Sequence, residues 1–112
     1  MKIISKISKN TYTSTKTKEV KNYINYFLIA DNGKSIQIRC AFADDYDKLA
    51  MICNVEGIEL QKRQSKLTYK NKSGTESHYY NYFVGLNNRF IQIKCAYMVD
   101  YSKLDMLAVY VG

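Results

Sequence analysis

One stretch of sequence decides the fold, and it occurs twice. Residues Tyr23–Phe42 read YINYFLIADNGKSIQIRCAF, and residues Tyr79–Tyr97 read YYNYFVGLNNRFIQIKCAY. The agreement continues on both sides and shifts by one residue only in the turn at 31–33. We therefore predict a single domain, residues 1–112, made of two tandem repeats at 1–56 and 57–112. A duplicated unit of this kind favours a pseudo-twofold relation between its copies.

Length and composition agree with one shared core. A chain of 112 residues with 46% apolar content is long enough for one globular domain, and neither repeat is expected to be stable alone. No apolar run approaches the length of a membrane span, and no signal peptide is recognisable, which favours a cytoplasmic protein. The three cysteines show no metal or disulfide spacing; Cys40 and Cys95 are expected to be small buried apolar residues.

A β-hairpin is expected at the centre of each repeat. Asn32-Gly33 in the first copy and Asn87-Asn88 in the second tolerate the positive φ angles of tight turns. Alternation along the strands then places Phe27 opposite Ile38. The core-facing residues predicted by this register are Tyr23, Asn25, Phe27, Ile29, Ile36, Ile38, Cys40 and Phe42, with Tyr79, Asn81, Phe83, Ile91, Ile93, Cys95 and Tyr97 in the second repeat.

The segment after each hairpin can be interpreted in two ways. Asp45 and Asp100 are suitable helix N-caps, yet residues 49–55 and 104–111 also alternate like a strand. We predict a short helical turn at 45–48 followed by a strand, and a full helix of two turns stays open. The fold class predicted from these elements is mainly β, with α+β as the alternative.

A catalytic or metal-binding set is not recognisable in the sequence. The one histidine, His78, is matched by Asn22 in the first repeat, so the duplication contains no paired histidine site. Asp44, Asp45 and Asp47 are matched by Val99, Asp100 and Ser102, which favours a solvated turn over a cation site. The sequence therefore predicts a binding protein without catalytic residues, metal or cofactor.

The outer face of the hairpins is the candidate binding surface. The predicted register places Tyr26 opposite Arg39 and Tyr82 opposite Lys94, a stacking ring beside a cation in both repeats. The net charge of +7 is concentrated in the N-terminal part of each repeat. These features predict binding of single-stranded DNA or RNA by Tyr26, Gln37, Arg39, Tyr82, Gln92 and Lys94 together with Lys16, Lys18, Lys70 and Lys72. The competing interpretation is that these tyrosine–cation pairs only stabilise the sheet.

The pattern N-Y-F-x5-G-x2-I-Q-I-x-C-x-F-x2-D-Y-x-K-L runs from Asn25 to Leu49. It resembles short uncharacterised proteins of AT-rich Gram-positive bacteria and their phages or mobile elements. The resemblance implies an alternative function, in which the protein binds and inhibits or modulates a host or defence protein. No membrane partner is expected, and the chain is predicted to be a monomer with pseudo-twofold symmetry or a homodimer.

Overall fold

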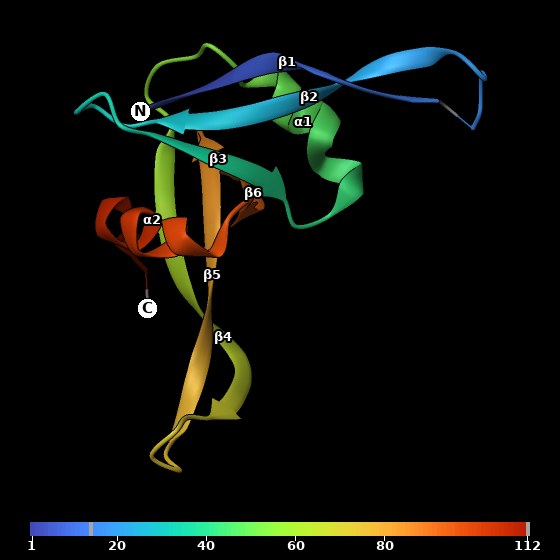
Figure 1. The fold of residues 1–112 in the computed structure, drawn as a ribbon. Coiled ribbons are helices and arrows are strands. Elements are labelled where there is room, and N and C mark those ends of the chain that lie inside the picture. The colour runs from blue at the N-terminus through green and yellow to red at the C-terminus, as the bar shows by residue number, and fades with distance from the viewer. Residues whose placement is uncertain (14, 112) are drawn as a thin grey trace.

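A single seven-stranded sheet organises the chain in a computed structural model that describes residues 1–13 and 15–111 (Figure 1). The strand order is β1-β2-β3-β6-β5-β4-β7, antiparallel except for the β4–β7 pair. The prediction of a mainly β, single-domain fold is confirmed. The elements are β1 (Lys2–Thr13), β2 (Val20–Ile29), β3 (Ser35–Cys40), a 3-10 turn η1 (Ala43–Asp45), α1 (Tyr46–Met51), β4 (Glu59–Lys70), β5 (Glu76–Leu86), β6 (Arg89–Cys95), η2 (Met98–Asp100), α2 (Tyr101–Leu107) and β7 (Val109–Tyr110).

The two halves of the chain meet at the centre of the sheet, where β3 pairs with β6. Arg39 lies directly opposite Lys94, its counterpart in the second repeat. The contacts around this pair are reciprocal, because Ala41 N–H donates to the Gln92 carbonyl and Ala96 N–H donates to the Gln37 carbonyl, both at 3.0 Å. A twofold axis through this pair would require such reciprocity. A pseudo-twofold relation between the complete repeats stays a prediction.

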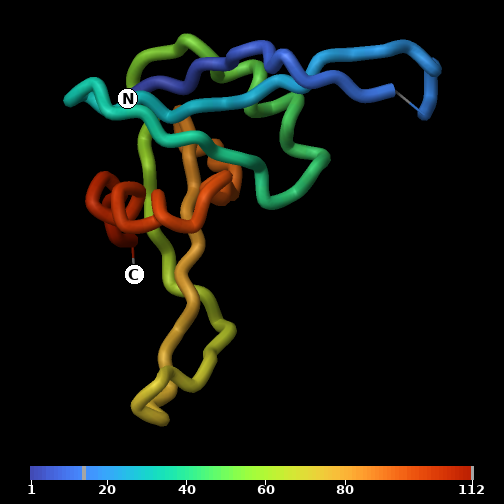
Figure 2. The backbone as a smooth tube through the Cα atoms, in the orientation of Figure 1, coloured from blue at the N-terminus to red at the C-terminus, as the bar shows by residue number. Residues whose placement is uncertain are grey.

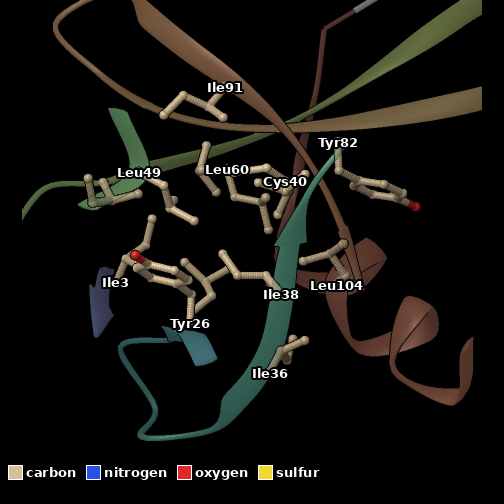
Figure 3. Close-up of a cluster of buried hydrophobic side chains, with 14 of the residues drawn as sticks. Ile3, Tyr26, Ile36, Ile38, Cys40, Leu49, Leu60, Tyr82, Ile91 and Leu104 are labelled. Carbon is tan, nitrogen blue, oxygen red and sulfur yellow. The ribbon is translucent and has the colours of Figure 1, made fainter. Parts of the chain in front are cut away.

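The core lies on one face of this strongly twisted sheet and receives residues from both halves (Figure 3). Ile3, Leu28, Leu60 and Val84 are at most 1% exposed, and each helix adds one buried leucine, Leu49 or Leu104. Burial of side chains of this size stabilises a fold by roughly 1.5–3 kcal/mol each. Because residues from both repeats fill one cluster, neither half has a complete core of its own.

The predicted hairpin register is wrong by one residue. Tyr26, not Phe27, lies opposite Ile38, and Tyr82 lies opposite Ile93. Turn geometry accounts for the shift: Asn87 and Asn88, both at positive φ, form a two-residue loop that fixes Leu86 opposite Arg89. The core face of β2 and β5 therefore carries Tyr26, Leu28, Tyr82 and Val84. The predicted core residues Tyr23, Asn25, Phe27, Ile29, Tyr79, Asn81 and Phe83 lie on the outer face of these strands, and Phe42 and Tyr97 are exposed.

The segment after each hairpin is more helical than predicted. Residues 46–51 and 101–107 form α-helices, so the open alternative of a longer helix is the correct one. Leu49 is buried whereas Met51 is 81% exposed, which contradicts the predicted strand, because residues two apart in a strand lie on one face. In place of the expected strand, the first repeat has a single β-bridge between Cys53 and Ile3, and the second repeat has the two-residue strand β7. Asp45 and Asp100 do occupy the N-cap positions, but their side chains make no capping hydrogen bond there.

Two long hairpins, β1–β2 and β4–β5, extend beyond the core as arms that run in different directions (Figure 2). Each arm begins at an irregularity in the ladder, between Ile7 and Thr11 in β1 and between Gln64 and Thr68 in β4. The Asn22 amide donates to the Ser8 carbonyl at 3.1 Å, and the His78 Nδ1 lies 3.1 Å from the Ser65 carbonyl. Each of these side chains thus contacts a backbone carbonyl at the irregularity of its own arm.

Gly85 allows β6 to approach β5 closely. A Cβ atom at this position would lie 2.5 Å from Cδ1 of Phe90 and would also collide with the Arg89 carbonyl oxygen. Gly85→Ala is expected to destabilise the fold by about 1–3 kcal/mol, since the backbone contact cannot be relieved by side-chain rotation. Urea unfolding monitored by circular dichroism measures this loss. Adding Phe90→Ser should restore only part of the stability, and a Gly85→Ala variant as stable as the natural protein would contradict the close packing.

Candidate nucleic-acid interface

Tyr26 and Tyr82 do not lie on the binding face that the sequence predicted for them. They are 7% and 8% exposed and pack against Tyr46 and Tyr101, with ring centroids 5.9 and 6.0 Å apart. Burial is the main cause that raises the pKa of both phenols. Neither ring has a face available for stacking on a base. The structure therefore does not support the prediction that Tyr26 and Tyr82 bind nucleic acid by stacking.

The other predicted residues of the sheet do lie on the outer face. Arg39 and Lys94 are exposed at its centre, and Gln37 and Gln92 are half-buried one step further along the same strands. The predicted lysines Lys16, Lys18, Lys70 and Lys72 are exposed in the arms. The sequence prediction thus placed the cations on the correct face and paired them with the wrong aromatic rings.

A row of cations and amides crosses the outer face of six strands. The ladder pairs Lys6 with Asn25, Arg39 with Lys94, and Asn81 with Arg63. Tyr26 pairs with Ile38, so the next step of this antiparallel register places Asn25 beside Arg39. In the same way, Tyr82 pairs with Ile93, which places Asn81 beside Lys94. We call this set the cationic row; in order across the sheet it is Lys6, Asn25, Arg39, Lys94, Asn81 and Arg63.

The centre of the cationic row is electrostatically unfavourable for the isolated protein. Arg39 and Lys94 are like charges placed directly opposite each other, an arrangement that destabilises a sheet. Among residues 1–13 and 15–111, no carboxylate forms an ion pair with either side chain. A bound anion between the two cations would relieve their repulsion, so this position is suited to a phosphate group.

The ends of the row are held against aromatic rings. Lys6 Nζ lies 5.0 Å from the centroid of Phe27, and the Arg63 guanidinium lies 4.6 Å from that of Phe83. Gln61 Oε1 also accepts hydrogen bonds from Arg63 Nε and Nη2, at 3.1 and 2.7 Å. These contacts orient the guanidinium while its remaining donors stay available to a ligand.

Each arm carries a pair of packed tyrosines on the continuation of the same face. Tyr12 and Tyr23 have ring centroids 4.7 Å apart, as do Tyr69 and Tyr79. The four rings are between 39% and 51% exposed. Half-exposed tyrosine rings next to lysines offer stacking surfaces for unpaired bases. Unlike the rings of Tyr26 and Tyr82, these four rings are accessible from the solvent.

One polar network differs between the repeats and lies beside the second arm. Asp105 accepts a hydrogen bond from the Tyr82 hydroxyl at 2.9 Å and forms an ion pair with Lys62. The Lys62 ammonium and the Tyr82 hydroxyl together lower the pKa of Asp105. The first repeat has Ala50 at the matching position, so this network is not a duplicated feature.

The Asp105 network predicts a pH-dependent contribution to stability. A carboxylate whose folded pKa is lowered stabilises the fold above its unfolded pKa, about 3.9, and loses that contribution as the pH falls through the folded value. Asp105→Ala is expected to lower the melting temperature at pH 7, by an amount that shrinks as the pH falls below about 3.9. Thermal unfolding of both proteins across this range measures the effect, and a difference that does not change with pH would contradict it.

The cysteines have no chemical role in the candidate interface. Burial, with a smaller contribution from Asp45 or Asp100, raises the pKa of Cys40 and Cys95 to about 11, so both thiols are protonated near neutral pH. In the part of the chain that the structure describes, no group of three or more histidine, cysteine or acidic side chains is placed to hold a metal ion. No helix among these residues has the length and apolarity needed to cross a membrane.

Sequence reasoning missed the four outer members of the cationic row: Lys6, Asn25, Asn81 and Arg63. Asn25 and Asn81 repeat at matching positions and were noticed, but the shifted register placed them in the core. Lys6 and Arg63 could be assigned only by the pairing of β1 with β2 and of β4 with β5. No family model matches the chain, and neither a curated protein nor a solved structure matches it. The function therefore has to be inferred from this geometry.

Proposed function

We propose that the protein binds single-stranded nucleic acid across the outer face of its sheet. The observation that carries the proposal is the Arg39–Lys94 pair, two like charges opposed at the centre of a row without a neutralising carboxylate among the described residues. Strands lie about 4.8 Å apart, so the six positions of the row span roughly 24 Å along the sheet. A strand of several nucleotides can follow such a row.

The chemistry of the row suits a phosphate backbone. Guanidinium, ammonium and amide groups are the side-chain donors that commonly contact phosphate oxygens, and such contacts position a strand without reading its sequence. The tyrosine pairs Tyr12–Tyr23 and Tyr69–Tyr79 lie further along the same face and are available for stacking. Base stacking on aromatic rings tolerates any sequence, so binding with little sequence preference is expected.

Fluorescence anisotropy with a labelled oligonucleotide of about 20 nucleotides tests the proposal. If four phosphates are neutralised, the affinity for a single strand should fall about fifty-fold between 50 and 200 mM salt, because condensed counterions are released on binding. A duplex of the same length should bind more weakly, since its bases cannot stack on the tyrosines. Absence of binding at micromolar protein and 50 mM salt would contradict the proposal.

A protein partner is the second candidate, and a different surface favours it. Met51, Met98, Val99 and Met106 in the helical segments are 80–87% exposed, and exposed apolar side chains of this kind occur in protein-binding surfaces. This candidate agrees with the resemblance to phage and mobile-element proteins that act on a host or defence protein. Capture of a partner from nuclease-treated lysate that is lost in Met51→Lys/Met106→Lys would support it. Unchanged capture by that variant would exclude this surface.

A further inference from the structure

A groove of about 720 Å³ lies between the two repeats, away from the centre of the cationic row. One wall is α1 with the residue that follows it, contributing Lys48, Met51 and Ile52, and the other is the β5–β6 hairpin, contributing Leu86, Arg89 and Ile91. Its volume is within the range of about 300–1,000 Å³ that is usual for small-molecule sites. The groove thus has the size and the mainly apolar lining of a ligand site.

The apolar wall of the groove is specific to one repeat. At the position that matches Leu86, the first repeat has Ala30. Phe90 packs over Gly85 and beside the Arg63 guanidinium on the outer face of the sheet, whereas α1 packs on the core face, so its ring is not part of this wall. Leu86 therefore gives this wall a large apolar side chain that the matching position of the first repeat lacks. This difference points to a role that the duplication alone does not explain.

Two cations accompany the apolar wall. Lys48 and Arg89 both line the groove and are exposed. Lys48 Nζ lies 3.6 Å from Asp45 Oδ1, an exposed contact of the kind that contributes little energy and is easily exchanged. Over the described ranges, 1–13 and 15–111, Arg89 has no ion-pair partner. The groove therefore combines an apolar body with positive charge at its margin.

We propose that this groove binds a small organic anion that has an aliphatic or aromatic body and one carboxylate or sulfonate group. The body lies against Met51, Ile52 and Leu86, and the anionic group lies between Lys48 and Arg89. This assignment is independent of the proposed nucleic-acid binding, because the groove residues are not members of the cationic row.

Binding of 1-anilinonaphthalene-8-sulfonate, an aromatic sulfonate whose fluorescence rises in apolar sites, tests the assignment. The natural protein should give a saturable signal at one site, and decanoate should displace the probe whereas decanol at equal concentration should not. Lys48→Gln/Arg89→Gln should weaken probe binding at least tenfold, as expected for loss of charge-assisted contacts. The matched control is Lys103→Gln/Lys34→Gln, which removes the same charge at equivalent positions of the other repeat and should change the affinity less than twofold.

Near-ultraviolet circular dichroism must show native tertiary structure in every variant, since this probe also binds partly unfolded proteins. A second variant, Leu86→Ala, introduces the residue of the first repeat and should reduce probe binding without removing a charge. Equal loss of binding in the two glutamine variants, or a signal that does not saturate, would overturn the assignment. Displacement of the probe by an oligonucleotide but not by decanoate would also overturn it, because the groove would then belong to the nucleic-acid site.

Discussion

Replacing Arg39 and Lys94 together with glutamine is expected to weaken oligonucleotide binding about 100-fold and to leave the fold at least as stable as before. Each hydrogen bond to a charged group contributes about 1.5–3 kcal/mol, so even at the lower end of this range two lost phosphate contacts correspond to about two orders of magnitude in affinity. Removal of two like charges that face each other across β3 and β6 should stabilise the sheet by a few tenths of a kcal/mol. Weaker binding combined with unimpaired stability indicates a functional residue pair.

Anisotropy titration and urea unfolding of the same samples measure these two effects. The matched control is Lys48→Gln/Lys103→Gln, which lowers the net charge equally at exposed helix positions that form only local contacts with Asp45 and Asp100. That control should lose less than threefold in affinity. Equal losses in the two variants would mean that net charge, and not the cationic row, controls binding.

Truncation of either buried helix leucine is expected to destabilise the whole domain. Leu49 and Leu104 are both 0% exposed and pack into the shared core, so Leu49→Ala and Leu104→Ala should each cost about 2–5 kcal/mol. Because residues of both repeats fill this core, each variant should unfold in one cooperative transition at a lower denaturant concentration. Circular dichroism and tyrosine fluorescence should report the same midpoint.

Methionines on the same helices provide the controls for this experiment. Met51 and Met106 are 81% and 85% exposed, so Met51→Ala and Met106→Ala should change the stability by no more than about 0.5 kcal/mol. Two separate unfolding transitions in either leucine variant would show that the repeats fold independently. That result would contradict the single shared core.

The order of elements could be predicted from the sequence because the duplication supplies two versions of the same pattern. Ile36, Ile38 and Cys40 alternate strictly, and all three are buried as predicted. Tyr23–Ile29 has large apolar residues on both faces, so alternation alone could not decide between Tyr26 and Phe27 as the core residue. The geometry of the turn determines which of the two residues faces the core, and this geometry depends on backbone angles that residue identity only partly determines.

The candidate site could be predicted only in part for the same reason. Arg39 and Lys94 could be predicted because they lie in strands whose apolar residues alternate strictly. The register of the partner strands differs by one residue from the predicted one. The neighbours of the two cations are therefore Asn25 and Asn81, where Tyr26 and Tyr82 were predicted. The direct pairing of Arg39 with Lys94 depends on contact between repeats that are 55 residues apart in the chain. No local pattern encodes such a contact.

The salt dependence of oligonucleotide binding tests the central claim most directly. If the cationic row neutralises four phosphates of a single strand, the slope of log K against log salt should be about −2.8, and it should become about −1.4 in Arg39→Gln/Lys94→Gln. Such a change would assign two of the neutralised phosphates to the centre of the row. An unchanged slope in that variant, or no measurable binding by the natural protein at low salt, would contradict the claim.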